Sequence, residues 1–266
     1  RGGAVIVPAV FYAVSAQGIA PALAINIAIA TSLAVIVFTG SASAFSHHRL
    51  GNVDWRVVGY WAPFLAIGAM LGATIVARVK TPSLMIIFGV FLWCVALVSL
   101  LKFANALPKK HTLSPSPNKT TSIDTTQPKS KVIKTTQLNS WPMRMLAIAI
   151  GAISALVGVG GGTMSVPALQ FSGRTIHKAI GTSSAMGVVL ALVATIWVFL
   201  TLQPVAVANT WGLIYWPAWL VIMPCTLFFA PVGAKLSQQF SPRFLRLAFI
   251  GLLIFVGAKM IAEGLA

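Results

Sequence analysis

Residues 158–167 read GVGGGTMSVP and interrupt a long apolar run over residues 142–172. Four of the first five residues are glycine, which lacks a Cβ and reaches backbone conformations closed to other residues. Pro167 follows, and a proline prevents an ordinary helix from running smoothly through its position. In lipid, unwound backbone costs several kcal/mol for each unpaired group unless it lines a cavity or is covered by protein. This stretch therefore predicts a broken helix with a functional role.

The composition around this stretch is typical of a membrane protein. Apolar residues make up 58% of the 266 residues and charged residues only 8%, and the mean hydropathy is +0.90. A soluble domain needs roughly 25% charged residues to cover its surface, whereas this length suits about eight membrane spans of roughly 20 residues each. We predict an all-α, polytopic bundle of transmembrane helices. The apolar segments are residues 3–14, 20–45, 57–77, 83–103, 142–172, 179–202, 211–234 and 244–264.

Two parts of the chain resemble each other. The sequence GGAVIVPA at residues 2–9 matches GGTMSVPA at 161–168, and ATSLA at 30–34 matches GTSSA at 181–185. Internal duplication is common in transporters, whose substrate site lies between the halves. We expect two repeats, each with a Gly-rich broken helix, separated by a polar disordered linker rich in Pro, Ser, Thr and Lys. The expected units are a first repeat at 1–104 that lacks its N-terminal part, the linker at 105–141 and a second repeat at 142–266.

The charged residues narrow the class of function. The net charge is +16, but the basic residues lie between apolar runs, as in membrane proteins, so nucleic-acid binding is disfavoured. The three carboxylates all lie outside the middle of the apolar runs, and they are Asp54, Asp124 and Glu263. Many proton- and cation-coupled carriers use a buried carboxylate, so this placement favours an anion, although Ser, Thr and backbone groups also bind cations.

The break itself is the candidate binding site. A new half-helix starting near Thr163 would point free N–H groups and its positive dipole end into the break, which suits a small oxyanion. Pairs of Thr and Ser hydroxyls at equivalent places in the two halves could add donors. The alternative for the glycines is tight packing between helices. The alternative for the hydroxyls is a hydrogen bond to the carbonyls of their own helix. The predicted substrate-binding residues are Gly2, Gly3, Pro8, Thr31, Ser32, Gly160, Gly161, Gly162, Thr163, Pro167, Thr182 and Ser183.

Two basic connections could play an accessory role. His47 and His48 are adjacent and would point to different sides of a helix, so they make a poor metal site. An interfacial turn anchored by Trp55 explains them better. Arg174 and Lys178, beside the second motif, could draw anions toward the site. We predict no catalytic residue and no metal site.

These motifs together resemble one family. The stretches GVGGGTMSVPAL, HKAIGTSSAMG, GGAVIVPAV, LAINIAIATSLAVIV and SHHRLGNVDW are similar to the signature of the TauE/SafE family of sulfite and organosulfur exporters. The resemblance implies a multi-pass permease of the bacterial or archaeal cytoplasmic (inner) membrane, with no nucleotide-binding domain and no organic cofactor. It also implies that the protein moves sulfite, sulfonates or related anions across the membrane. Asp54 and Trp55 are further positions at which this chain matches the family's motifs. Arg1 departs from the pattern, since it stands where the family has glycine.

The expected function is a secondary transporter for small sulfur-containing anions. A passive anion channel and a non-transporting membrane scaffold subunit are the alternatives. A membrane enzyme is disfavoured, because no nucleophile–base pair or set of metal ligands is evident. The expected partners are a small anionic substrate and the lipid bilayer, with a homodimer as a candidate assembly.

Overall fold

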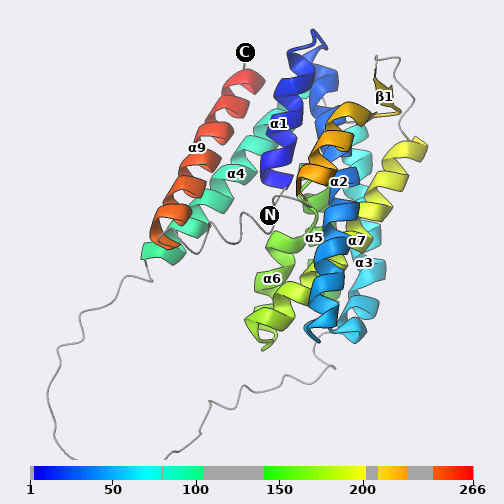
Figure 1. Ribbon diagram of the computed structural model, residues 1–266, viewed down its shortest axis with the longest axis vertical. Coiled ribbons are helices and arrows are strands. Elements are labelled where there is room, and N and C mark those ends of the chain that lie inside the picture. The colour runs from blue at the N-terminus through cyan, green and yellow to red at the C-terminus, as the bar shows by residue number, and fades with distance from the viewer. Residues whose placement is uncertain (1–2, 79–80, 105–140, 202–208, 227–241, 266) are drawn as a thin grey trace, which may run out of the picture.

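The computed structural model describes residues 3–78, 81–104, 141–201, 209–226 and 242–265, and these residues are nearly all helical. Figure 1 shows the long helices running side by side in one bundle. The helices are α1 (Gly3–Ser15), α2 (Pro21–Arg49), α3 (Trp55–Arg78), α4 (Thr81–Ala104), α5 (Trp141–Val157), α6 (Gly162–Phe171), α7 (Ile176–Thr201), a helical segment at 216–226 and α9 (Pro242–Leu265).

Five of the described helices are long and apolar enough to cross a membrane, and they are Leu23–Arg49, Trp55–Val76, Pro82–Leu101, Ile176–Thr201 and Leu247–Leu265. Their outer faces carry large apolar side chains such as Phe45, Phe199 and Phe255, which are 56%, 60% and 68% exposed. A soluble protein rarely exposes so much apolar surface, so these faces fit contact with lipid. The chain is a multi-pass membrane protein; the predicted count of about eight spans stays a prediction.

The apolar segment predicted at 211–234 differs from a simple helix at its start. Residues Thr210–Trp211 form β1 and Ile214–Tyr215 form β2, which pair as a short antiparallel hairpin with Thr210 opposite Tyr215. Gly212 has a positive φ of 65°, as a tight turn requires. Helical structure begins only at residue 216. Trp and Tyr in this stretch count as apolar, but they are also residues that favour strands.

Helices of the first predicted repeat pack directly against helices of the second. Helix α2 lies against α7, α3 lies against both α5 and α7, and α4 lies against α9 (Figure 1). Helices α3 and α5 approach so closely that a Cβ added to Gly72 would lie 2.2 Å from the carbonyl oxygen of Ala152. Small residues allow such close backbone approach between membrane helices. The division into two homologous repeats stays a prediction; the predicted linker lies outside the described residues except for Trp141, which begins α5.

Helix α2 is the most buried of the candidate spans, with 67% of its apolar window inside the structure. The core around it contains Ile25, Ile29 and Leu33 from α2 and Leu190 from α7. Four polar side chains of these two helices are buried in the same core, and they are Thr31, Ser32, Thr182 and Ser183. A buried polar group is costly without a partner. The hydrogen-bond partners of these four hydroxyls therefore help to define the candidate site.

Candidate functional site

The glycine stretch separates two helices. Helix α5 ends at Val157 and α6 begins at Gly162, and we call the four residues between them, 158–161, the α5–α6 break. Gly158, Gly160 and Gly161 have φ values of 70°, 71° and 70°. This left-handed conformation costs an ordinary L-residue roughly 1–2 kcal/mol, so glycine is required here. Pro167 lies inside α6, which continues to Phe171. The glycines therefore set the break, and α6 continues past Pro167, where the sequence predicted that a helix would not run smoothly.

Side chains from three helices cover the break. A Cβ added to Gly158 would lie 3.1 Å from Val7 of α1, and one added to Gly160 would lie 2.7 Å from Ile36 of α2. On the other side, a Cβ on Gly161 would lie 3.1 Å from Leu190 of α7. All three glycines are buried. The unwound backbone is thus enclosed by protein, which is the condition for irregular backbone at membrane depth.

The two predicted serines bond on either side of the break, one to its first residue and the other to the first residue of α6. The Ser32 hydroxyl of α2 donates a hydrogen bond of 2.8 Å to the carbonyl oxygen of Gly158. The Ser183 hydroxyl of α7 donates one of 3.0 Å to the carbonyl oxygen of Gly162. Both side chains are buried. The structure therefore brings Ser32 and Ser183 together with the glycines, as side chains that hold the unwound backbone in place.

The two predicted threonines point to other partners. The Thr31 hydroxyl oxygen accepts a hydrogen bond of 3.0 Å from the backbone N–H of Tyr215 in β2. The Thr182 hydroxyl oxygen accepts one of 3.0 Å from the backbone N–H of Asp54. Successive residues on a helix point in directions about 100° apart, so a Thr–Ser pair cannot aim both hydroxyls at one place. The threonines fasten the hairpin and the α2–α3 turn, and each hydroxyl keeps its hydrogen for another acceptor.

Ser165 is a site residue that the sequence reasoning missed. Its side chain is fully buried, and its hydroxyl has no hydrogen-bond partner among the described residues. It lies in the first turn of α6, where its N–H donates 3.0 Å to the carbonyl oxygen of Gly161. A Cβ on Gly161 would lie 4.0 Å from the Ser165 hydroxyl and 3.8 Å from that of Ser154. The position of Ser165 three residues after the last glycine was the available signal, because it places the side chain in the first turn of the new half-helix.

The remaining predicted residues at the break are only partly described. Gly2 and the side chain of Thr163 lie outside the described residues, and so does the start of the predicted first-half break. Gly3 begins α1, and Pro8 is buried inside that helix. Gly162 begins α6 and is half-buried. The described part of the site is therefore built from the second glycine motif, with α1, α2 and α7 around it.

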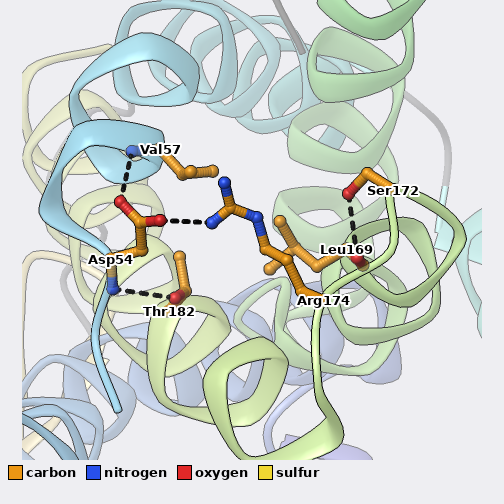
Figure 2. A network of polar contacts seen from close by, with 6 residues as sticks. All are labelled: Asp54, Val57, Leu169, Ser172, Arg174 and Thr182. Carbon is orange, nitrogen blue, oxygen red and sulfur yellow. Dashed lines mark hydrogen bonds and ion pairs between the residues drawn. The ribbon is translucent and has the colours of Figure 1, made fainter. Parts of the chain in front are cut away.

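Arg174 faces a carboxylate. Its guanidinium forms an ion pair with Asp54, and the two side chains are 16% and 30% exposed (Figure 2). Asp54 also caps α3, since its carboxylate accepts a hydrogen bond of 3.4 Å from the N–H of Val57. Arg174 follows α6, and its N–H donates 3.3 Å to the carbonyl oxygen of Leu169. The family resemblance included Asp54 among the motif positions but gave it no binding role, and its place directly before α3 is one at which a capping residue is expected.

The histidines and Lys178 do not join the break. His48 is exposed, and its Nδ1 accepts a hydrogen bond of 3.1 Å from the Trp55 indole N–H, with the two rings packed edge to face. His47 is half-buried, and Lys178 is exposed at the start of α7. The described residues contain no group of three or more His, Cys, Asp or Glu side chains that could hold a metal ion.

Comparison with known proteins identifies the family. The family model for the sulfite exporter TauE/SafE matches residues 2–260. A probable membrane transporter protein of Haemophilus influenzae is 30% identical over 97% of this chain and 89% of its own length. Two further probable membrane transporter proteins are more distant. One, from Bacillus subtilis, is 25% identical over 99% of this chain and 91% of its own length. The other, from Methanocaldococcus jannaschii, is 24% identical over 89% of this chain and 79% of its own length. No solved structure gives a significant match. The resemblance seen in the sequence motifs is thus confirmed, and the chain belongs to the TauE/SafE family of membrane transporters.

Proposed function

We propose that this chain is a secondary transporter of small sulfur-containing anions, such as sulfite or sulfonates, and that it binds them at the N-terminus of α6. The name of the matching family supports this class of substrate. The observation that carries the proposal is Ser165, a fully buried hydroxyl without a hydrogen-bond partner among the described residues, in the first turn of a helix that begins inside the protein.

The chemistry of the α6 N-terminus suits an oxyanion. The helix dipole adds a partial positive charge at such an end. The N–H groups of Gly162 and Met164, in the first turn of α6, donate at 2.8 and 3.3 Å to the carbonyl oxygens of Gly160 and Gly161, so an arriving anion would take the place of these short-range acceptors. Anions bind readily at such ends. Ser165 would add a buried hydroxyl donor. Gly160 and Gly161 have no Cβ, so a ligand could come close to their backbone. A sulfite or sulfonate group offers three oxygens, enough to accept from several donors at once.

The same site supports the finer picture of two repeats. The broken helix of the second repeat, α5–α6, would meet its counterpart from the first repeat near mid-membrane, and one repeat would rock against the other. The chain would act as a multi-pass protein of the cytoplasmic membrane. The enclosed break favours a carrier over a passive channel, because a carrier covers its substrate between two access states.

Flux through proteoliposomes tests the proposal. The purified protein would be reconstituted, and uptake of labelled sulfite, sulfate and taurine would be measured against concentration, with counterflow to separate a carrier from a channel. Replacing Ser165 with Ala should raise the KM about tenfold or more, as expected for one hydrogen bond to a charged group. Ser46→Ala is the matched control, because the Ser46 hydroxyl is exposed and donates to Ala42 within α2. A well-folded protein that moves no sulfur anion would refute the proposed function.

A further inference from the structure

We propose that Arg174 is an oxyanion-binding subsite at the entrance of the transport path, and that the Asp54 carboxylate occupies this subsite while the entrance is closed. This inference rests on the proposed function, since it names a second contact for the same anion. Its starting observation is the ion pair between the two side chains, both of which retain contact with solvent (Figure 2).

The chemistry of the pair supports exchange with a small anion. A carboxylate presents two oxygens in one plane to a guanidinium, and one face of a sulfite or sulfonate group presents two oxygens in a similar way. Arg174 and Asp54 are 16% and 30% exposed, so neither is sealed from an arriving solute. A partly exposed pair contributes little to stability. An anion of the same geometry can therefore compete with Asp54 for Arg174.

Asp54 keeps its position without Arg174. Its backbone N–H donates to the Thr182 hydroxyl, and its carbonyl oxygen accepts from Val57 at 3.1 Å and Val58 at 3.2 Å as α3 begins. Arg174 is fixed separately, through the α6–α7 loop. There Gly173 donates 2.9 Å to the carbonyl of Gln170. The ion pair thus joins two elements that are anchored independently, and it can part without unfolding either.

Helix α7 links the ion pair to the start of α6. Thr182 holds the backbone of Asp54, and the following residue, Ser183, holds the carbonyl oxygen of Gly162 at the start of α6. One dipeptide therefore connects the ion pair to the proposed anion site. An anion released from Arg174 would next meet the hydroxyls of α7 and the N-terminus of α6.

Close packing beside the ion pair is what a closed entrance requires. A Cβ added to Gly181 would lie 2.4 Å from the backbone oxygen of Asn52 and 3.1 Å from the His47 Cβ. The start of α7 therefore touches the α2–α3 turn directly beside the ion pair, with no room for a side chain. An anion can pass here only when these elements separate. Breaking the Asp54–Arg174 pair removes one of the two polar links that hold the α2–α3 turn, and the hydrogen bond from the Asp54 N–H to Thr182 is the other.

Transport kinetics give the first test. Asp54→Asn removes the competing charge but keeps the α3 cap, because Asn caps helices as well as Asp. We expect it to lower the KM for sulfite by about threefold, and Arg174→Gln to raise it by about threefold, the sizes typical of a partly exposed charge partner. Arg56→Gln is the matched control, since it removes an exposed positive charge two residues from Asp54. An unchanged KM in both variants, with only the maximal rate altered, would overturn the subsite.

Thiol labelling gives a second test that needs no transport. The two native cysteines, Cys94 and Cys225, are exposed and would first be replaced by Ala. A cysteine introduced by Ser165→Cys would then be labelled with a membrane-impermeant ethylsulfonate thiol reagent, applied to vesicles of either orientation. Asp54→Asn and Arg174→Gln should each speed labelling from one side, and taurine, a sulfonate that does not consume the reagent as sulfite would, should slow it. If both variants are labelled no faster than the Ser165→Cys protein that keeps Asp54 and Arg174, the proposed entrance is overturned even if sulfite flux is normal. Faster labelling without any flux would refute only the proposed function.

Discussion

The hydroxyl of Ser32 in α2 donates a buried hydrogen bond of 2.8 Å to the carbonyl oxygen of Gly158, which lies 126 residues further along the chain. Gly158 is the first residue after α5, so this bond ties the unwound backbone to the most buried helix of the bundle. In hydrocarbon the Gly158 carbonyl would have no water to replace a lost partner. The bond is therefore a structural requirement of the break.

Replacing Ser32 with Ala should destabilise the protein by about 1–3 kcal/mol, because the buried Gly158 carbonyl loses its donor. The measurement is the thermal midpoint of the detergent-solubilised protein, followed by tryptophan fluorescence. Ser41→Ala is the control, since that exposed hydroxyl donates to Val37 in the same helix. Equal midpoints for the two variants would contradict the role given to Ser32.

Replacing Gly161 with Ala should cost roughly 1–2 kcal/mol, because a left-handed φ of 70° is strained for any residue with a Cβ. The added Cβ would also press on Leu190 at 3.1 Å. Gly59→Ala is the matched control within α3, where the added Cβ meets nothing within 4 Å, and it should be neutral or stabilising. Thermal unfolding of both variants checks the difference, and a Gly161→Ala protein as stable as Gly59→Ala would show that the break does not need its present backbone.

Replacing Gly181 with Ala should push the start of α7 away from the α2–α3 turn, because the Cβ cannot occupy a position 2.4 Å from the Asn52 oxygen. The hydrogen bond from Asp54 to Thr182 would lengthen or break with this shift. Hydrogen–deuterium exchange should therefore accelerate in peptides that cover residues 50–58. Protection equal to that of the parent protein in these peptides would mean that the close contact is absent in solution.

Replacing Thr31 with Val keeps the shape of the side chain but removes the acceptor for the buried N–H of Tyr215. An unsatisfied buried donor costs about 1–3 kcal/mol, so the β1–β2 hairpin should exchange amide hydrogens faster. Thr39→Val is the control, because the Thr39 hydroxyl donates only to Val35 within its own helix. Similar exchange at residues 210–216 in both variants would rule out the anchoring role of Thr31.

The sequence alone was enough to predict the helical class, because this class depends on local properties, and α5 ends at Val157, directly before the consecutive glycines. Long apolar runs form helices in lipid, and consecutive glycines leave a helix poorly defined. The hairpin at 210–215 was not predicted, since Trp211 and Tyr215 are apolar enough to be counted with the helix that follows. Hydropathy does not distinguish a short strand from the first turn of a span.

The partners of the polar side chains could not be predicted, because they depend on packing between distant segments. Asp54 and Arg174 are 120 residues apart, and nothing local to either residue indicates the other. The Thr–Ser pairs were expected to act alike, but neighbouring positions on a helix face different elements, so Ser32 meets the break and Thr31 meets the hairpin. Ser165 required knowledge of where α6 begins and of what covers its first turn.

Gly158, Gly160 and Gly161 leave the α5–α6 break without a single side chain of its own at these three positions. Substitution at these glycines cannot change the binding properties of their peptide groups selectively, because any side chain placed there first disturbs the backbone conformation. Under the proposed function, divergence in the preferred solute must then arise at the side chains around the glycines, such as Ser165, Ile36 and Leu190. Swapping these positions between relatives, with the glycines untouched, should change the preferred solute.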